Sequence, residues 1–165
     1  MWNRLKRIVL RRRDLTSEFI NAVTSNWFGP NPELTEDAQD RLKACIDSST
    51  FVSLVSEMQL SLIGLSDSGA WWPKRALVFG YINGLSDGMA KSRGETSQWP
   101  GLLTSMLAIN LVMKGIWNEQ EVFDTCSRLT ECEDPHYIEG AQAGFRDSFN
   151  MERKEIKTGL FELMR

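Results

Sequence analysis

Two stretches of this chain, 60 residues apart, share one spacing of glycine, aspartate and arginine, and this repeat constrains the fold more than any other sequence feature. The matching positions are Gly80, Gly84, Asp87 and Arg93 in the first stretch and Gly140, Gly144, Asp147 and Arg153 in the second. Two glycines four residues apart lie on one face of a helix and allow a second helix backbone to approach closely. We therefore expect two helices with helix-packing residues at Gly80, Gly84, Gly140 and Gly144.

The rest of the sequence also follows a helical pattern. Apolar residues recur every three or four positions, and no stretch alternates between apolar and polar residues as a half-buried strand does. Hydrophobic residues make up 42% and charged residues 25% of the 165 residues, which is typical of a globular domain. The sequence predicts an all-α fold, a compact bundle of six to eight helices.

The repeat extends, more weakly, beyond the glycines. Residues 51–65 resemble residues 102–116 at an offset of 51, and an additional helix near 119–130 accounts for the difference between the two offsets. This pattern favours an internally duplicated helix pair, around 51–93 and 102–153, packed about a pseudo-twofold axis. Chance similarity between amphipathic helices is the alternative.

Capping signals predict the helix boundaries. Thr35 is an expected N-cap, and its helix is expected to end near residues 47–49 and to be followed by a separate, central helix over 51–63. Asn118 and Glu121 have the spacing of a capping box, and Pro135 suits the first turn of a helix. The expected later helices cover residues 74–92, 101–116, 119–130 and 134–149.

Charge divides the chain into two parts. Residues 1–13 contain no acidic residue, and their six basic residues are Arg4, Lys6, Arg7, Arg11, Arg12 and Arg13. The remaining 152 residues contain 13 basic and 22 acidic residues, a net charge of -9. A Gly-Pro-Asn-Pro turn at 29–32 separates residues 1–32, a basic amphipathic N-terminal arm or helix, from residues 33–165, an acidic all-helical domain.

The six basic residues of the arm are candidates for binding an anionic surface. Positive charge at a helix N-terminus opposes the helix dipole, so helix stability does not explain them. Together with apolar residues such as Leu5 and Ile8, they are typical of a helix that lies on a membrane surface. The alternative is that the arm packs on the acidic body of its own chain. Nucleic acid is not an expected partner because the body repels phosphate.

The tract Trp71-Trp72-Pro73-Lys74-Arg75 supplies the candidate partner-binding residues Trp71, Trp72, Lys74 and Arg75. Trp and Arg are enriched where binding energy concentrates, and two adjacent indoles in a turn are difficult to bury together. We expect at least one of them to be exposed and to contact a protein partner or a second copy of the chain. The alternative is that the tract is wholly structural.

Two further sets of residues could hold a metal. Asp87 and Asp147 would form a carboxylate pair if their helices crossed at the glycines, although two aspartates are few ligands for a cation. Cys126, Cys132 and His136 have a wider spacing than zinc sites prefer, and we interpret the cysteines as reduced thiols. We expect no cofactor and assign no catalytic residue.

These observations favour a non-enzymatic protein-interaction module of the adaptor, regulatory or toxin-neutralising type, with a basic arm that docks on an anionic surface. The alternative is a small metal-dependent enzyme that uses the carboxylate pair. The odd cysteine count, together with apolar stretches too short to cross a bilayer and no secretory signal, predicts a cytoplasmic protein, with peripheral contact to an anionic membrane as a further expectation.

Overall fold

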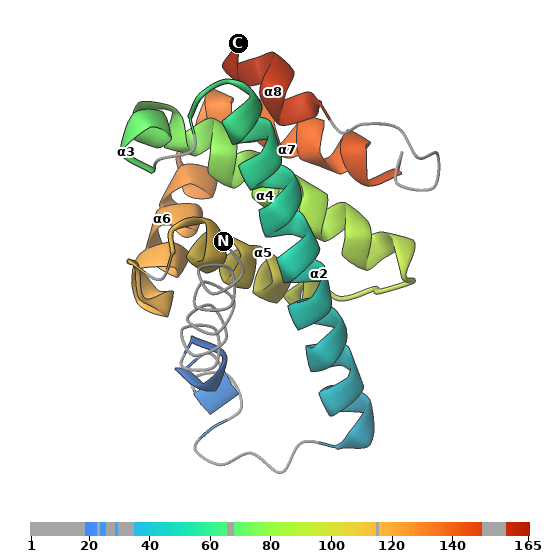
Figure 1. Ribbon diagram of the computed structural model, residues 1–165. Coiled ribbons are helices and arrows are strands. Elements are labelled where there is room, and N and C mark those ends of the chain that lie inside the picture. Colours follow the sequence, from blue (N-terminus) through green and yellow to red (C-terminus); the bar gives the residue numbers. More distant parts are fainter. Residues whose placement is uncertain are drawn as a thin grey trace, which may run out of the picture.

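The computed structural model describes residues 19–22, 24–25, 29, 35–65, 68–114, 116–149 and 158–165. Its labelled elements are seven α-helices and a short 3-10 turn, and no strand occurs in the described residues. The elements are α2 (Glu36–Leu62), α3 (Ser68–Trp71), η1 (Trp72–Lys74), α4 (Arg75–Ser92), α5 (Trp99–Val112), α6 (Glu119–Glu131), α7 (Pro135–Phe149) and α8 (Gly159–Met164). The predicted all-α bundle of six to eight helices is confirmed (Figure 1).

The closest helix packing in the bundle lies between α4 and α7, at the repeated glycines. A Cβ atom added to Gly80 would lie 2.0 Å from the carbonyl oxygen of Tyr137, and one added to Gly84 would lie 1.9 Å from that of Ala141. Real Cβ atoms do not approach backbone this closely, so only glycine fits at these two positions of α4.

The contacts of α7 on α4 repeat this geometry. A Cβ atom added to Gly140 would lie 2.2 Å from the carbonyl oxygen of Leu77, and one added to Gly144 would lie 2.1 Å from that of Tyr81. Tyr137 and Ala141, which face the glycines of α4, lie 60 positions after Leu77 and Tyr81, which face the glycines of α7. The two helices run parallel and are related locally by a pseudo-twofold axis.

The flanking helices do not share this symmetry. α5 packs along α2 and α4, and α2 also packs on α4. If α2 matched α5 as α4 matches α7, the packing of α5 on α4 would be mirrored by packing of α2 on α7. The contact between α2 and α7 is at most marginal. The sequence similarity between residues 51–65 and 102–116 therefore does not correspond to a symmetric placement, and within the described residues the pseudo-symmetry is confined to α4 and α7.

The predicted break near residues 47–49 is wrong, because α2 runs without interruption from Glu36 to Leu62. Serine hydroxyls often favour turns because they compete for backbone hydrogen bonds. In α2 they instead donate to carbonyls of the same helix. The Ser49 hydroxyl donates to the Ile46 carbonyl at 2.7 Å, and the Ser56 hydroxyl donates to the Val52 carbonyl at 2.9 Å. These internal hydrogen bonds allow the serines to be buried without ending the helix.

The predicted caps are confirmed. The Ala38 amide donates to the Thr35 hydroxyl at the start of α2. The Asn118 and Glu121 side chains each accept from the other residue's amide at 2.9 Å, which forms the capping box of α6. Pro135 begins α7. One end differs: α5 stops at Val112 rather than near residue 116, and Lys114 has a left-handed φ of 56°.

A buried polar network fastens the C-terminal helix α8 to the core. The Gln59 amide donates to the Tyr81 hydroxyl at 2.7 Å, and that hydroxyl donates to the Asp147 carboxylate at 2.7 Å. Asp147 also accepts from the Gly159 amide, and the Gln59 carbonyl oxygen accepts from the Leu160 amide. Side chains of α2 and α7 thus satisfy the free N–H groups at the start of α8, which no side chain of its own caps.

The basic residues 1–13 lie outside the described residues, as do the Gly-Pro-Asn-Pro turn except Gly29 and the repeated arginine Arg153. Phe19 is described and is buried in the core. Phe19, within the predicted arm, therefore packs on the core, and the division between residues 1–32 and 33–165 stays a prediction. Among the described helices, none combines the length and the apolar character that crossing a membrane requires.

Candidate functional site: a groove between four helices

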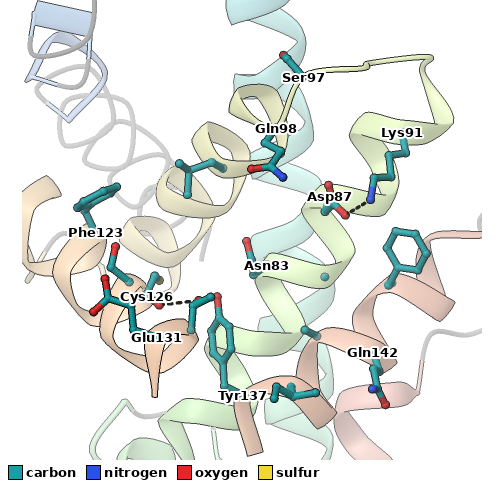
Figure 2. Close-up of a pocket in the computed structure, with 18 of the residues that line it drawn as sticks. Asn83, Asp87, Lys91, Ser97, Gln98, Phe123, Cys126, Glu131, Tyr137 and Gln142 are labelled. Atoms are coloured by element: carbon teal, nitrogen blue, oxygen red, sulfur yellow. Dashed lines mark hydrogen bonds and ion pairs between the residues drawn. The ribbon is translucent and has the colours of Figure 1, made fainter. Parts of the chain in front are cut away.

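A groove of about 1100 Å³ lies between α4, α5, α6 and α7 (Figure 2). Its lining comes from one face of α4 between Asn83 and Lys91, from the segment 95–98 with the start of α5, and from one face each of α6 and α7. Small residues, among them Gly84, Gly101 and Ala141, line part of the groove. The glycine packing that brings α4 against α7 therefore also shapes this groove.

Two large apolar side chains in the groove are exposed. Phe123 on α6 is 40% exposed and Ile138 on α7 is 42% exposed, while Leu102 and Phe145 are half-buried beside them. Single exposed apolar side chains are common on protein surfaces, but apolar groups gathered in a concave site are typical of a binding surface.

Two carboxylates of the groove form ion pairs with cations of the chain. Asp87 accepts from the Lys91 ammonium at 2.7 Å, and Glu95 pairs with Arg41, which lies on α2, at 2.5 Å. Arg41 and Lys91 balance these two carboxylates.

Glu131 and Glu133 form no ion pair in the described part of the chain. Both are exposed and lie at the C-terminal end of α6. The helix dipole is negative there, so the two carboxylates add to an already negative potential. The net electrostatic character of the groove is acidic at this end.

The thiol and the phenol of the groove are not activated. Burial raises the pKa of the Cys126 thiol to about 12. Burial, with a smaller contribution from nearby Cys126, also raises the pKa of Tyr137 to about 12. Both groups are protonated at neutral pH, which is the opposite of what a nucleophilic thiolate or a general base requires.

The expectation of a substantially exposed indole in the Trp71-Trp72 tract is wrong. Trp71 is 2% exposed and its ring packs edge-on against Phe79 at 6.1 Å. Trp72 is half-buried and its ring packs edge-on against Trp117 at 5.0 Å. The short helix α3 and the 3-10 turn fold the tract onto α4, so two adjacent aromatics are covered from different sides.

The two cations of that tract also have partners within the chain. The Lys74 ammonium donates to the Met164 carbonyl at 2.9 Å, at the end of α8. The Arg75 guanidinium lies 5.1 Å from the Trp72 ring centroid and donates to the Trp72 carbonyl. Lys74 and Arg75 therefore hold neighbouring elements together in this structure.

Asp87 and Asp147 have separate partners and face different elements. Asp87 lies in the groove against Gly101 of α5, whereas Asp147 accepts from Tyr81 and lies against Gly159 of α8. In the described part of the chain, no group of three or more His, Cys, Asp or Glu side chains is placed to hold a metal ion.

The cysteines form no disulfide bond in the described structure. Cys45 and Cys126 are buried, Cys132 is exposed, and all three are free thiols. The His136 imidazole lies 4.0 Å from the Glu139 carboxylate.

Gly84, Asp87 and Cys126 of the groove lining were singled out from the sequence for other roles, whereas Phe123 and Ile138 were not. One signal was present: Phe123 lies beside, rather than on, the apolar face of α6 that is formed by Val122, Cys126 and Leu129. A large aromatic residue on the polar face of a strongly amphipathic helix points away from the core. That the side chain borders a groove depends on how α6 meets α4 and α7, which no local pattern specifies.

Comparison with known proteins adds no assignment: no protein-family model, curated protein or solved structure matches the chain. The groove is therefore the basis for a functional proposal.

Proposed function

We propose that this protein is a non-enzymatic interaction module, of the adaptor, regulatory or toxin-neutralising type, and that the groove is its partner-binding surface. The observation that carries the proposal is the concave site between four helices with Phe123 and Ile138 exposed in it. Such side chains gain free energy when a partner covers them, and large apolar groups in a pocket are typical anchors of binding energy.

The chemistry of the groove supports binding rather than catalysis. Cys126 and Tyr137 are protonated at neutral pH, and the carboxylates of Asp87 and Glu95 are engaged by cations. A general acid or base needs a pKa near the working pH, and a nucleophile needs a base within hydrogen-bond distance. The groove instead provides a partner with a concave shape, an apolar surface and charged side chains.

The basic residues of the arm, 1–13, form the second part of the proposal. Their six positive charges would attach the module to an anionic surface such as a membrane rich in acidic lipids. The free thiols of the body support a reducing, cytoplasmic-type compartment. In this arrangement the arm would determine where the module is held and the groove would determine what it binds.

Affinity capture from the native source tests the groove directly. The Phe123→Asp variant places a charge among the apolar groups of the groove, and it should lose the partners that the wild-type chain retains. Ile116→Asp is the matched control, because Ile116 is 66% exposed and does not line the groove. Equal capture by both variants and the wild type would contradict the proposal.

A further inference from the structure

We propose that the segment received by the groove is a basic amphipathic helix of a partner protein. This inference rests on the proposed function and adds the chemistry of the partner. Three features of the groove carry it, namely its size, the position of its apolar groups and the carboxylates that form no ion pair within the described residues.

The size of the groove suits a helix. A helix with side chains is roughly 10 Å across and rises about 1.5 Å per residue, so a volume near that of the groove corresponds to about two and a half turns. Small-molecule pockets are usually smaller and enclosed. The groove is long enough to involve α4, α5, α6 and α7 together, and exposed side chains such as Gln98 and Gln142 border it (Figure 2).

The apolar groups are placed on more than one wall. Phe123 belongs to α6, Ile138 and Phe145 belong to α7, and Leu102 belongs to α5. An amphipathic helix presents apolar side chains at intervals of three, four and seven residues along one stripe. Such a stripe can contact the apolar side chains of α5, α6 and α7 at the same time, whereas a single apolar side chain cannot.

The remaining charge selects a basic partner. Within the described lining, Lys91 is the only cation and it is bound to Asp87. Glu131 and Glu133 lie at the negative end of α6, where Arg128 is the one basic residue of the last turn, and neither carboxylate forms an ion pair within the described residues. Carboxylates at a helix C-terminus are locally unfavourable. Lysine or arginine side chains on the polar face of a bound helix would relieve this repulsion, whereas an acidic or phosphorylated segment would increase it.

The groove already contains one example of cation recognition. The Lys91 ammonium lies 5.1 Å from the centroid of the Phe145 ring, in addition to its ion pair with Asp87. A cation beside an aromatic face is stabilised by the ring quadrupole. Phe123, exposed on the other wall, offers a second aromatic face to a partner's cation.

Fluorescence anisotropy with two labelled synthetic peptides tests the inference on the full chain. One peptide is a 14-residue amphipathic helix of leucine and lysine, and the other has glutamate in place of every lysine. We expect the Leu/Lys peptide to bind at least tenfold more tightly than the Leu/Glu peptide and to weaken as salt is raised, because exposed charge pairs are screened.

Two matched variants locate the charge effect. Glu131→Gln with Glu133→Gln should weaken binding of the Leu/Lys peptide about fivefold or more. Asp40→Asn with Asp47→Asn removes the same number of exposed carboxylates from α2, outside the groove, and should leave binding within about twofold. Equal binding of the two peptides, or equal effects of the two double variants, would overturn the inference.

The two proposals can fail separately. If Phe123→Asp loses the native partner while the Leu/Lys peptide binds no better than the Leu/Glu peptide, the basic-helix inference is wrong and the groove remains the binding surface. If Phe123→Asp retains the native partner, the groove is not that surface and the proposed function is wrong.

Discussion

At the scale of single residues, Gly84 shows how one missing side chain determines the packing of two helices. Alanine is favoured over glycine by about 1 kcal/mol within a helix. At this position, however, the added Cβ atom would lie 1.9 Å from a backbone oxygen of α7 and could be accommodated only if the helix moved. The cost of separating α4 from α7 should exceed the gain in helix propensity.

We therefore predict that Gly84→Ala lowers the free energy of unfolding by about 1 to 3 kcal/mol, as overpacking usually does. Gly69→Ala is the control, because its added Cβ atom would meet nothing within 4 Å. Urea denaturation followed by circular dichroism measures both. A Gly84→Ala variant as stable as the control would mean that the close crossing does not exist.

The two tyrosines of the chain, Tyr81 and Tyr137, give a second prediction at this scale. Burial, reinforced by Asp147, raises the pKa of Tyr81, and burial raises the pKa of Tyr137 to about 12. Tyrosine in an unfolded chain ionises near pH 10. The folded protein therefore retains tyrosine protons that the unfolded chain loses, and the contribution of the two tyrosines to stability should be constant below about pH 10 and be lost above it.

Absorbance at 295 nm measures tyrosine ionisation directly. The native protein should show little tyrosinate signal up to about pH 11, and most of the signal should appear at higher pH. The same titration in 8 M urea should have a midpoint near pH 10. A native midpoint near pH 10 would show that the tyrosines are solvated.

At the scale of helices, local signals predict the starts of elements better than their continuity. Thr35, the Asn118 capping box and Pro135 each act within four residues, and the structure has all three. A helix end was predicted near residues 47–49, yet α2 continues through them and packs against α5. Likewise, the glycine spacing indicated which helices meet, whereas the groove depends on four helices that no short-range pattern relates.

Gln59 provides the prediction at this scale, because its carbonyl oxygen accepts from the amides of Leu160 and Phe161 at 2.8 and 3.0 Å. Gln59→Ala leaves the buried Leu160 amide and the half-buried Phe161 amide without this acceptor, at a cost of about 1 to 3 kcal/mol. Hydrogen exchange should become faster at these two amides than at those of α4. Ser61→Ala, at an exposed position of α2, is the control. Unchanged exchange in α8 would show that Gln59 does not hold this helix.

At the scale of the whole molecule, the basic charge that would attach the protein to an anionic surface and the acidic groove that would bind a partner lie in different parts of the chain. Residues 1–13 carry +6 and the remaining 152 residues carry -9. The groove adds an acidic end at Glu131 and Glu133. If the arm serves attachment, its charges should matter for surface binding and not for folding.

We predict that replacing Arg11, Arg12 and Arg13 with glutamine weakens binding to vesicles containing phosphatidylserine by about 100-fold, since each cation near such a surface contributes about 1 kcal/mol. The melting temperature should change by no more than a few degrees. The control replaces three exposed cations of the body, Lys114, Arg128 and Arg146, with glutamine. A large loss of thermal stability in the arm variant would show instead that the arm packs on the acidic body.

The most direct test of the binding groove is a map of backbone amide chemical shifts in the full chain as the Leu/Lys peptide is added. The largest changes should fall on the groove, at Phe123, Ser127, Ile138 and Gln142. A second exposed apolar surface provides the internal comparison: the face of α2 formed by Phe51, Leu54, Met58 and Leu62. Changes concentrated on that face, or spread evenly over the acidic surface, would contradict the groove as the binding site.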